Sequence, residues 1–355
     1  MQLGILGLAK AGKTLLFNTL TASQKDTDKF AASKKTHLAT AKVPDPRLEK
    51  LRDLYKPKRY VPATVEYIDI PGIQKGEGSQ SLDLAQLRTV DALVHVVRAF
   101  EDPELPHPEG NVDPERDIAT VDLELIYADH ELVERRLARL AKSAKGGLSP
   151  DETHEQRLLA EVILPTLEEE KPLREIDLAA EDEKRLRGYQ LLSAKPILIV
   201  INVAEEDVAE GASSGAQSSG DRSHRVTISA PIEEEISQLS AEEQREFLDD
   251  LGLEEPSLNR VLRASYDLLG LIAFFTVGED EVRAWTIRRG TRAREAAGVI
   301  HSDLARGFIR AEVIPWNDLL ELGSLPAARD KGLLRLEGKD YVIADGDVTH
   351  VRFNV

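Results

Sequence analysis

Residues 7–14 carry the most specific chemical pattern of the sequence, Gly-Leu-Ala-Lys-Ala-Gly-Lys-Thr, a complete G-x4-G-K-[ST] phosphate-binding loop. Gly7 and Gly12 allow the backbone to bend and to approach a ligand closely. Lys13 is expected to bridge the β- and γ-phosphates of a nucleoside triphosphate, and Thr14 to place its hydroxyl on Mg²⁺. The sequence therefore predicts a triphosphate site with a magnesium ion near its first residues.

The residues on either side place this loop between a strand and a helix. Leu3, Ile5 and Leu6 form a short apolar run typical of a buried strand, and apolar residues recur with helical spacing from Leu15 to Leu20. Backbone N–H groups at the start of such a helix bind phosphate. The residues of this loop expected at the nucleotide are Lys10, Ala11, Gly12, Lys13, Thr14 and Leu15.

A second phosphate-sensing pattern, Asp69-Ile70-Pro71-Gly72, ends another hydrophobic run. Asp69 is expected to hold Mg²⁺ through water, and the N–H of Gly72 to reach the γ-phosphate. Ile73 follows, where Ras-like GTPases keep a Gln that orients the attacking water. An Ile cannot do this, so either hydrolysis is slow or another group supplies the function.

The base-binding pattern follows a later apolar strand as Asn202-Val203-Ala204-Glu205. GTPases use Asn-Lys-x-Asp here, and the Asp accepts from both guanine N–H donors. Glu205 displaces the carboxylate by one methylene, so the fit to guanine should be poor, while Val203 offers an apolar face to a purine. Ser229-Ala230, after the next strand, stand where GTPases keep a base-contacting Ser-Ala. ATP and GTP both stay open as ligands.

Composition narrows the class of protein. The 355 residues suggest two or three domains, and the absence of cysteine excludes disulfides and Cys-based metal sites. No apolar run is long enough to span a bilayer, and no signal peptide precedes the first strand. We therefore expect a cytoplasmic protein without membrane contact.

The charge is distributed unevenly. A net charge of −17 argues against a general affinity for nucleic acid. Residues Thr276 to Val355, however, carry 12 Lys and Arg against 13 Asp and Glu. Contact with a polyanion is therefore better placed on this near-neutral C-terminal part.

The order of the apolar runs predicts an α/β fold with a parallel, doubly wound sheet. The expected strands are Leu3–Leu6, Val65–Ile70, Ala92–Val97, Ile197–Val203 and Val226–Ile228. The long stretch between the third and fourth of these strands carries two helical stripes, broken at Gly146, Gly147 and Pro150. This pattern predicts an antiparallel helical hairpin inserted into the sheet domain.

The last third of the chain changes in texture. Residues Glu210 to Ser223 are rich in Gly, Ala and Ser, which predicts a flexible loop, and Leu251 to Ile272 is largely helical in pattern. The β-prone pieces that follow are Phe274–Val277, Ala284–Ile287, Tyr341–Ile343 and Val348–Asn354. They predict a small α+β domain.

Several longer stretches resemble one family specifically, the YchF subfamily of Obg-related P-loop NTPases, also known as the Obg-like ATPases. The stretches that carry the resemblance, over nearly the whole chain, are Val43–Leu48, Lys75–Gly78, His95–Arg98, Asn202–Glu205, Leu251–Pro256, Glu281–Thr286, Gly307–Ala311 and Glu337–Tyr341.

The resemblance implies three domains and a catalytic histidine. These are a P-loop NTPase (Obg-type G) domain over residues 1–115 and 195–272, an inserted coiled coil over 116–194, and a β-grasp-like TGS domain over 273–355. In the family, a histidine on a mobile loop is the proposed substitute for the missing Gln. That loop matches Glu101 to Pro114, and the histidine falls on His107.

The first switch departs from the family pattern Phe-x-Thr-x-x-Pro-Asn, whose Thr completes the Mg²⁺ shell. The corresponding segment is Phe30-Ala31-Ala32-Ser33-Lys34-Lys35-Thr36. Neither Ser33 nor Thr36 aligns cleanly with the family's Thr, so both are kept as candidates. Thr36 is our choice for the metal ligand, and Ser33 is the alternative.

Together these features predict a cytoplasmic, monomeric molecular switch that hydrolyses ATP with Mg²⁺. We expect it to bind the ribosome or another RNA-containing complex. Two alternatives remain. One is an Obg-type GTPase, and the other is a nucleotide-responsive binding adaptor whose hydrolysis is vestigial.

Overall fold

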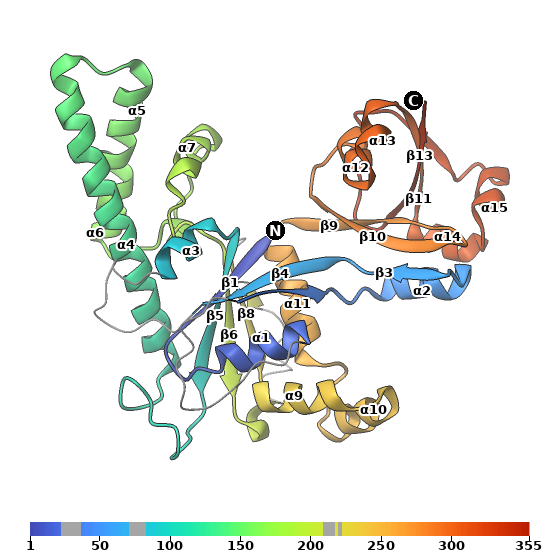
Figure 1. The fold of residues 1–355 in the computed structure, drawn as a ribbon, viewed down its shortest axis with the longest axis horizontal. Helices are drawn as coiled ribbons and strands as arrows, with labels where there is room; N and C mark the ends of the chain where they lie inside the picture. The colour runs from blue at the N-terminus through green and yellow to red at the C-terminus, as the bar shows by residue number, and fades with distance from the viewer. Residues whose placement is uncertain (23–36, 71–82, 209–216, 219–221, 355) are drawn as a thin grey trace. The chain divides into compact units, whose positions relative to one another are not determined.

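The computed structural model describes residues 1–22, 37–70, 83–208, 217–218 and 222–354 (Figure 1). The chain divides into two compact units. The first comprises Met1–Ala39 and Glu66–Ala264, and the second comprises Thr40–Val65 and Ser265–Val355. Among the described residues, no helix combines the length and the apolar character needed to cross a bilayer.

A seven-stranded sheet organises the first unit, in the order β2-β4-β1-β5-β6-β8-β7. The pairs β1/β4, β1/β5, β5/β6 and β6/β8 are parallel, which confirms the predicted parallel sheet and all five predicted strands. The strands are β1 Gln2–Leu6, β2 His37–Lys42, β4 Thr64–Asp69, β5 Ala92–Ala99, β6 Ile197–Val203, β7 Gln217–Ser218 and β8 Ser223–Ile228.

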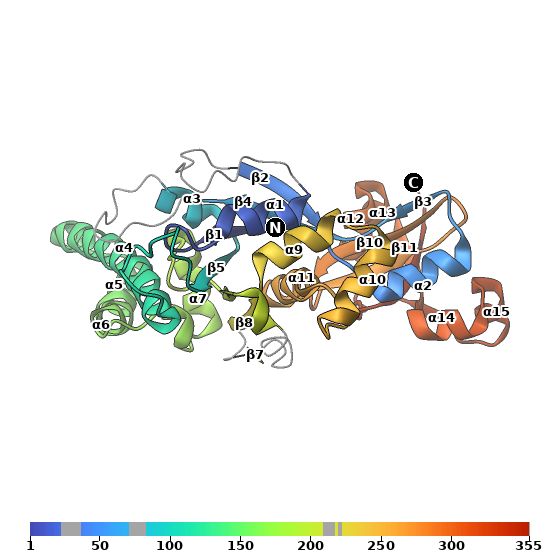
Figure 2. The same cartoon turned by 90° about the horizontal axis from the view of Figure 1, so that it is seen from below.

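Helices cover both faces of this sheet. On one face, α3 (Asp83–Thr89) and the base of α4 (Pro114–Ser143) bury Leu87, Val121 and Leu125 against strand residues. Elsewhere α1 (Lys13–Thr21) lies beside α9 (Ala230–Gln238), as Figures 1 and 2 show. After α9 the chain continues through α10 (Ala241–Asp250) and α11 (Ser257–Leu268), and the boundary between the two units falls within α11.

The helical hairpin predicted between β5 and β6 is present. Helix α4 passes into a 3-10 turn (Ala144–Gly146), and after residues 147–149 the chain returns through α5 (Pro150–Leu158), a π-helical turn (Leu159–Ile163) and α6 (Leu164–Glu168). The seam between the two arms buries Val133, Leu140, Leu159 and Ile163, among others. The chain rejoins the sheet after α7 (Ala180–Leu186).

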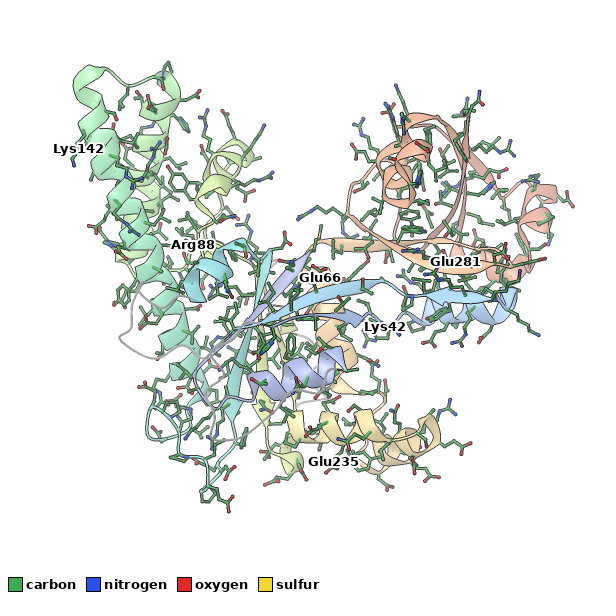
Figure 3. The ribbon with its side chains drawn as sticks, in the orientation of Figure 1. Lys42, Glu66, Arg88, Lys142, Glu235 and Glu281 are labelled. Atoms are coloured by element: carbon green, nitrogen blue, oxygen red, sulfur yellow. The ribbon has the colours of Figure 1, made fainter. Side chains whose placement is uncertain are left out.

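A buried carboxylate fastens the hairpin to the sheet. Asp129 of α4 is fully buried and accepts hydrogen bonds from the backbone N–H groups of Leu192 and Ser193, at 2.9 and 2.7 Å. The guanidinium of Arg88, labelled in Figure 3, reaches it from α3 at 3.0 Å. This cluster sets where α4 stands on the sheet.

Residues 40–65 belong to the second unit, although they connect two strands of the first sheet. They contain α2 (Pro46–Tyr55) and β3 (Arg59–Val61), and β3 pairs in parallel with β10. The guanidinium of Arg47 binds both Asp45 and Asp345, each at 2.8 Å. The stretch Val43–Leu48 therefore has a structural role that sequence reasoning did not identify. The predicted three-domain boundaries, including the TGS assignment, remain a prediction.

The second unit is built on a six-stranded sheet in the order β12-β11-β13-β9-β10-β3. Its strands after β3 are β9 Leu271–Thr276, β10 Glu281–Arg288, β11 Phe308–Pro315, β12 Arg335–Glu337 and β13 Asp347–Phe353, and its helices after α2 are α12 Ala293–Ile300, α13 Ser302–Arg306, α14 Trp316–Leu322 and α15 Leu325–Asp330. The α+β character is confirmed. One predicted strand is wrong, because Tyr341–Ile343 makes only an isolated bridge from Val342 to Arg292.

Two further predictions concern the helix after Leu251 and the loop after Glu210. The helix expected over Leu251–Ile272 is shorter, because Pro256 precedes its first turn and Gly270, at φ +63°, follows its last. Most of the predicted flexible loop Glu210–Ser223 lies outside the described residues.

Candidate functional site

The phosphate loop runs from the end of β1 into α1, as the sequence predicts. Both of its glycines are sterically required. A Cβ on Gly7, at φ +144°, would lie 2.3 Å from the carbonyl oxygen of Val96, and a Cβ on Gly12, at φ +96°, would lie 2.5 Å from Nδ2 of Asn202. Lys10 also adopts a left-handed conformation, with φ 65°. Glycine at positions 7 and 12 thus permits a loop shape that a residue with a Cβ could not adopt at either position.

Lys13 already points into this loop. Its ammonium group donates to the carbonyl oxygens of Gly7 and Leu8, at 3.2 and 2.7 Å. Burial lowers the pKa of Lys13 to about 8, although the nearby Asp69 carboxylate opposes the shift. Among the residues that the structure describes, this buried cation faces two neutral carbonyls and the Asp69 carboxylate, and a phosphate would stabilise it.

The predicted metal residues that the structure describes lie together. The hydroxyl of Thr14, in the first turn of α1, donates to Oδ2 of Asp69 at 3.2 Å, and Asp69 is 5% exposed at the end of β4. A hydroxyl and a carboxylate are hard oxygen ligands that suit Mg²⁺, which usually keeps several waters and binds few protein groups. The described ranges contain no cluster of three or more His, Cys, Asp or Glu side chains that could hold a metal on its own.

The remaining switch residues lie outside the described ranges. They are Phe30–Thr36, with both Ser33 and Thr36, and the residues from Pro71 to Gln80, with Gly72 and Ile73.

On the base side, Asn202 connects two loops. Its Nδ2 donates to the carbonyl of Ala11 at 3.1 Å, and its Oδ1 accepts from the N–H of Ala230 at 2.9 Å. Ser229 is 1% exposed, and its hydroxyl has no hydrogen-bond partner among the described residues. Residue 202 thus brings the phosphate loop and the Ser229-Ala230 pair together, as expected for one nucleotide site.

Val203 and Glu205 follow at the open end of β6. Val203 is half-buried, whereas Glu205 opens a short 3-10 turn, Glu205–Asp207, and is exposed. Leu15 is half-buried on α1. The structure therefore places the exposed Glu205 carboxylate just beyond the end of β6, two residues after Val203.

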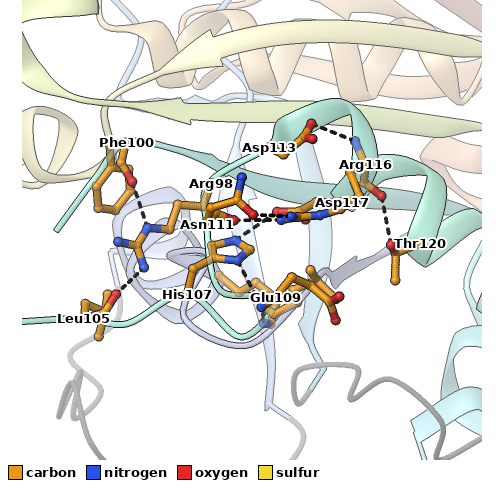
Figure 4. Close-up of polar contacts among 12 residues, drawn as sticks. Arg98, Phe100, Leu105, His107, Glu109, Asn111, Asp113, Arg116, Asp117 and Thr120 are labelled. Carbon is orange, nitrogen blue, oxygen red and sulfur yellow. Dashed lines mark hydrogen bonds and ion pairs between the residues drawn. The ribbon is translucent and has the colours of Figure 1, made fainter. Parts of the chain in front are cut away.

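The side chain of His107 is buried beside the phosphate loop and is not solvated. It is 4% exposed, and its Nε2 lies 2.9 Å from Oδ2 of Asp117 in α4 (Figure 4). The same crevice is lined by Leu8 and Ala9 of the phosphate loop. The histidine is therefore adjacent to the phosphate site, but it is engaged with a carboxylate.

Two basic residues fix the chain that leads to His107. Arg98 is 2% exposed, and its guanidinium donates to the carbonyl oxygens of Phe100 and Leu105, at 2.9 and 2.7 Å. The ammonium of Lys10 lies 3.5 Å from the carbonyl of Pro106. The phosphate loop itself thus contacts the residue just before His107.

Two residues of this region were missed by sequence reasoning. In the sequence, Asp117 looks like an ordinary acidic residue in the first turn of a helix. Only the structure shows that it contacts His107. His95 belongs to a stretch that was noted, but nothing in the sequence places it, fully buried, beneath Gly7.

Comparison with family models finds two matches. Residues 2–136 match a model described as "50S ribosome-binding GTPase", and residues 271–354 match the YchF GTPase C-terminal model, which is described as a protein of unknown function.

Curated relatives and a solved structure match along nearly the whole chain. A protein of Bacillus subtilis (strain 168) named "Ribosome-binding ATPase YchF" is 44% identical over 363 residues, with 99% of each chain covered. A protein of the same name from Escherichia coli O157:H7 is 40% identical over 366 residues, again with 99% of each covered. The structure of the Schizosaccharomyces pombe YchF GTPase matches with a TM-score of 0.85 at 32% identity, covering 99% of this chain and 97% of the other. Because the identity to these proteins is 32–44% over nearly the whole of each chain, and the fold is the same, the chain belongs to the YchF family.

Proposed function

We propose that this protein is a nucleotide-dependent switch that binds and hydrolyses ATP with Mg²⁺ and acts on the ribosome. The observation that carries the proposal is the geometry of the phosphate loop, whose side chains are arranged in a way that suits a triphosphate and Mg²⁺. Lys13 is buried there with carbonyl partners, and Thr14 and Asp69 meet at its edge. The names of the bacterial relatives supply the ATPase activity and the ribosome as expectations for this chain.

In this proposal the chain's residues have distinct tasks. The N–H groups of the phosphate loop and the Lys13 ammonium bind the triphosphate, and Thr14 and Asp69 hold Mg²⁺, with Thr36 as a further candidate. When bound, the metal neutralises charge that develops between the phosphates. Because Ile73 offers no polar group, His107 is the candidate that positions the attacking water.

The proposal is tested by steady-state hydrolysis of Mg²⁺-ATP. We expect Lys13→Ala to abolish turnover and to weaken ATP binding, and Thr14→Ala to weaken the dependence on Mg²⁺. Both variants should keep the circular dichroism of the parent. Unchanged ATP affinity in a folded Lys13→Ala variant would rule out this site.

The base is a separate question, since the bacterial relatives are named ATPases and the fission yeast structure a GTPase. An Obg-type GTPase is therefore the second candidate. Titration calorimetry with non-hydrolysable ATP and GTP analogues, each with Mg²⁺, decides between them. A chain that binds nucleotide but does not turn it over, even with ribosomes present, is instead the adaptor with vestigial hydrolysis.

Ribosome contact is proposed for the second unit, through four exposed arginines at the end of β10 and the start of α12: Arg288, Arg289, Arg292 and Arg294. Arg292 pairs with Asp340 in a solvent-exposed contact, which contributes little, so its charge remains available to phosphate. Because its bacterial relatives are named for ribosome binding, we also propose that the chain is cytoplasmic. A monomeric state remains a prediction.

Co-sedimentation with ribosomes tests this surface. Changing all four arginines to Glu should reduce pelleting, and the difference from wild type should be largest at low salt and shrink as the salt concentration rises. A matched variant changes four exposed arginines of the hairpin region, Arg135, Arg139, Arg157 and Arg187. Loss of pelleting only in the hairpin variant would move the contact to the helical arm and contradict the proposal.

A further inference from the structure

Both ring nitrogens of His107 are engaged. Nε2 lies 2.9 Å from Oδ2 of Asp117, and Nδ1 accepts the backbone N–H of Glu109 at 3.2 Å. Because Nδ1 is an acceptor, the hydrogen-bond pattern assigns the proton to Nε2, which donates to the carboxylate. In this arrangement the imidazole has no free lone pair with which to accept a proton from water.

The pair is also shielded from water. The exposed fractions of the two side chains are 4% for His107 and 3% for Asp117. A hydrogen bond to a charged acceptor is strengthened where water is excluded, and breaking it leaves a buried carboxylate short of a donor. The contact is therefore a stable resting position for the imidazole.

Asp117 is itself fixed on the helix. Its Oδ1 accepts from Nε and Nη2 of Arg116, at 3.1 and 2.8 Å. Arg116 reaches back to Asn111, with Nη1 and Nη2 each 2.7 Å from the side-chain and main-chain oxygens, and its N–H donates to Asp113, the N-cap of α4 (Figure 4). The first turn of α4 and the loop after His107 thus form one hydrogen-bonded unit.

We propose that Asp117 is a positioning residue that latches His107 in an inactive orientation, so that the first turn of α4 controls when the imidazole can serve hydrolysis. The inference rests on the proposed catalytic role of His107. The latch is connected mechanically to the hairpin, because α4 continues from Asp117, past its anchor at Asp129, into the outer arm. A partner that shifts α4 would open the latch and raise turnover.

The direct test is Asp117→Ala. Loss of a hydrogen bond to a charged group should raise the population of released His107, and hence the basal kcat, about tenfold. KM for ATP should stay the same, since the residue does not contact nucleotide. Asp117→Asn keeps an acceptor oxygen and the side-chain shape, so it should give a smaller rise and covers the case in which the Ala variant folds poorly.

Two further variants separate the latch from a general effect on the helix. His107→Ala should lower kcat by roughly one to two orders of magnitude, and the double variant with Asp117→Ala should turn over no faster than His107→Ala alone. Glu115→Gln is the matched control. It removes a charge from the same helical turn, where Glu115 pairs with Arg225 at 2.7 Å and does not contact His107. It should leave kcat unchanged.

A spectroscopic measurement decides the latch independently of turnover. In long-range ¹H–¹⁵N spectra of the protein without nucleotide, His107 should show a fixed Nε2–H tautomer, identified by its loss in His107→Gln. Asp117→Ala should convert this pattern to that of a freely exchanging imidazole. An unchanged tautomer pattern, a kcat that does not rise, or a rise that persists without His107 overturns the latch. Wild-type turnover in His107→Ala contradicts the catalytic role instead, and the tautomer measurement then still decides whether the latch exists.

Discussion

The carboxamide of Asn202 joins the phosphate loop to the N-terminus of α9, because it donates to Ala11 and accepts from the N–H of Ala230 at 2.9 Å. Asn202 is 1% exposed, so neither bond is shared with bulk water. The packing of Nδ2 also explains why residue 12 is glycine, since a Cβ there would lie 2.5 Å from this nitrogen. A residue known for base recognition in GTPases is here a structural link within the site.

Replacing Asn202 by Ala should therefore weaken the protein before any nucleotide binds. It leaves a buried N–H at Ala230 and a buried carbonyl at Ala11 unpaired, at a cost of about 2–4 kcal/mol. Chemical denaturation should show this loss. Asn259→Ala is the control, because the contact that its side chain makes among the described residues is a long one, 3.4 Å to the carboxylate of Glu255, and its loss should cost little. Equal stability of wild type and Asn202→Ala would contradict the linking role.

The depressed pKa of Lys13 predicts proton uptake on nucleotide binding. Without ligand its pKa is about 8, and phosphate contact should raise it, because an anion favours the charged ammonium. Above pH 8 the free protein has lost this proton and must regain it to bind. ATP affinity should then fall about tenfold between pH 7 and pH 9.

Calorimetry in buffers of different ionisation enthalpy measures that uptake directly. Lys13→Arg is the matched variant, because a guanidinium stays charged over this range. It should bind ATP with an affinity that depends little on pH. An uptake in Lys13→Arg equal to that of wild type would assign the proton to another group.

How much could be read from the sequence depends on the range of the interactions. The phosphate loop, Asp69 and all five predicted strands were predictable, since local spacing and apolar runs determine them. The partner of His107 was not, because Asp117 joins it only through tertiary packing. Nor was the placement of residues 40–65, which depends on pairings such as Arg59 with Glu281 that span most of the chain. Strands β11 and β12 were missed because charged residues interrupt their apolar pattern, as Arg310 and Glu312 do in β11.

Glu205 provides a test of base preference. Its carboxylate is exposed at the end of β6, one methylene longer than the Asp that accepts from guanine in GTPases. Glu205→Asp should improve the fit and raise GTP affinity by about 1–3 kcal/mol if two donors become paired. Titration with a non-hydrolysable GTP analogue measures the gain.

Glu206→Asp is the control for that change, because it shortens the neighbouring exposed carboxylate in the same turn. It should leave both affinities as they are. Wild-type GTP binding much tighter than ATP binding would show that Glu205 already accommodates guanine, and the preference for adenine would be wrong.

His95 is a buried base without a hydrogen-bond partner among the described residues. Its side chain is fully buried beside the phosphate loop, and neither ring nitrogen is paired. Burial, helped by the positive charges of Arg174 and Lys13, lowers its pKa to about 3. The imidazole is therefore neutral in the folded protein over the whole range in which an unfolded chain would protonate it.

This difference makes the free energy of unfolding depend on pH. Below about pH 6.5 the unfolded chain binds a proton at His95 that the folded chain refuses, so stability falls as pH falls from that value toward the folded pKa. The contribution between pH 7 and pH 5 is about 2 kcal/mol. His95→Leu, of similar volume, should remove this part of the slope while keeping stability at pH 7 within about 1 kcal/mol of wild type, because no paired group is lost. Urea denaturation at pH 5 and pH 7 measures both quantities.

His301→Asn, which changes an exposed histidine at a helix N-cap, should keep the wild-type slope. If His95→Leu loses as much stability on acidification as wild type, the imidazole accepts a proton in the folded protein, and its burial does not keep it neutral.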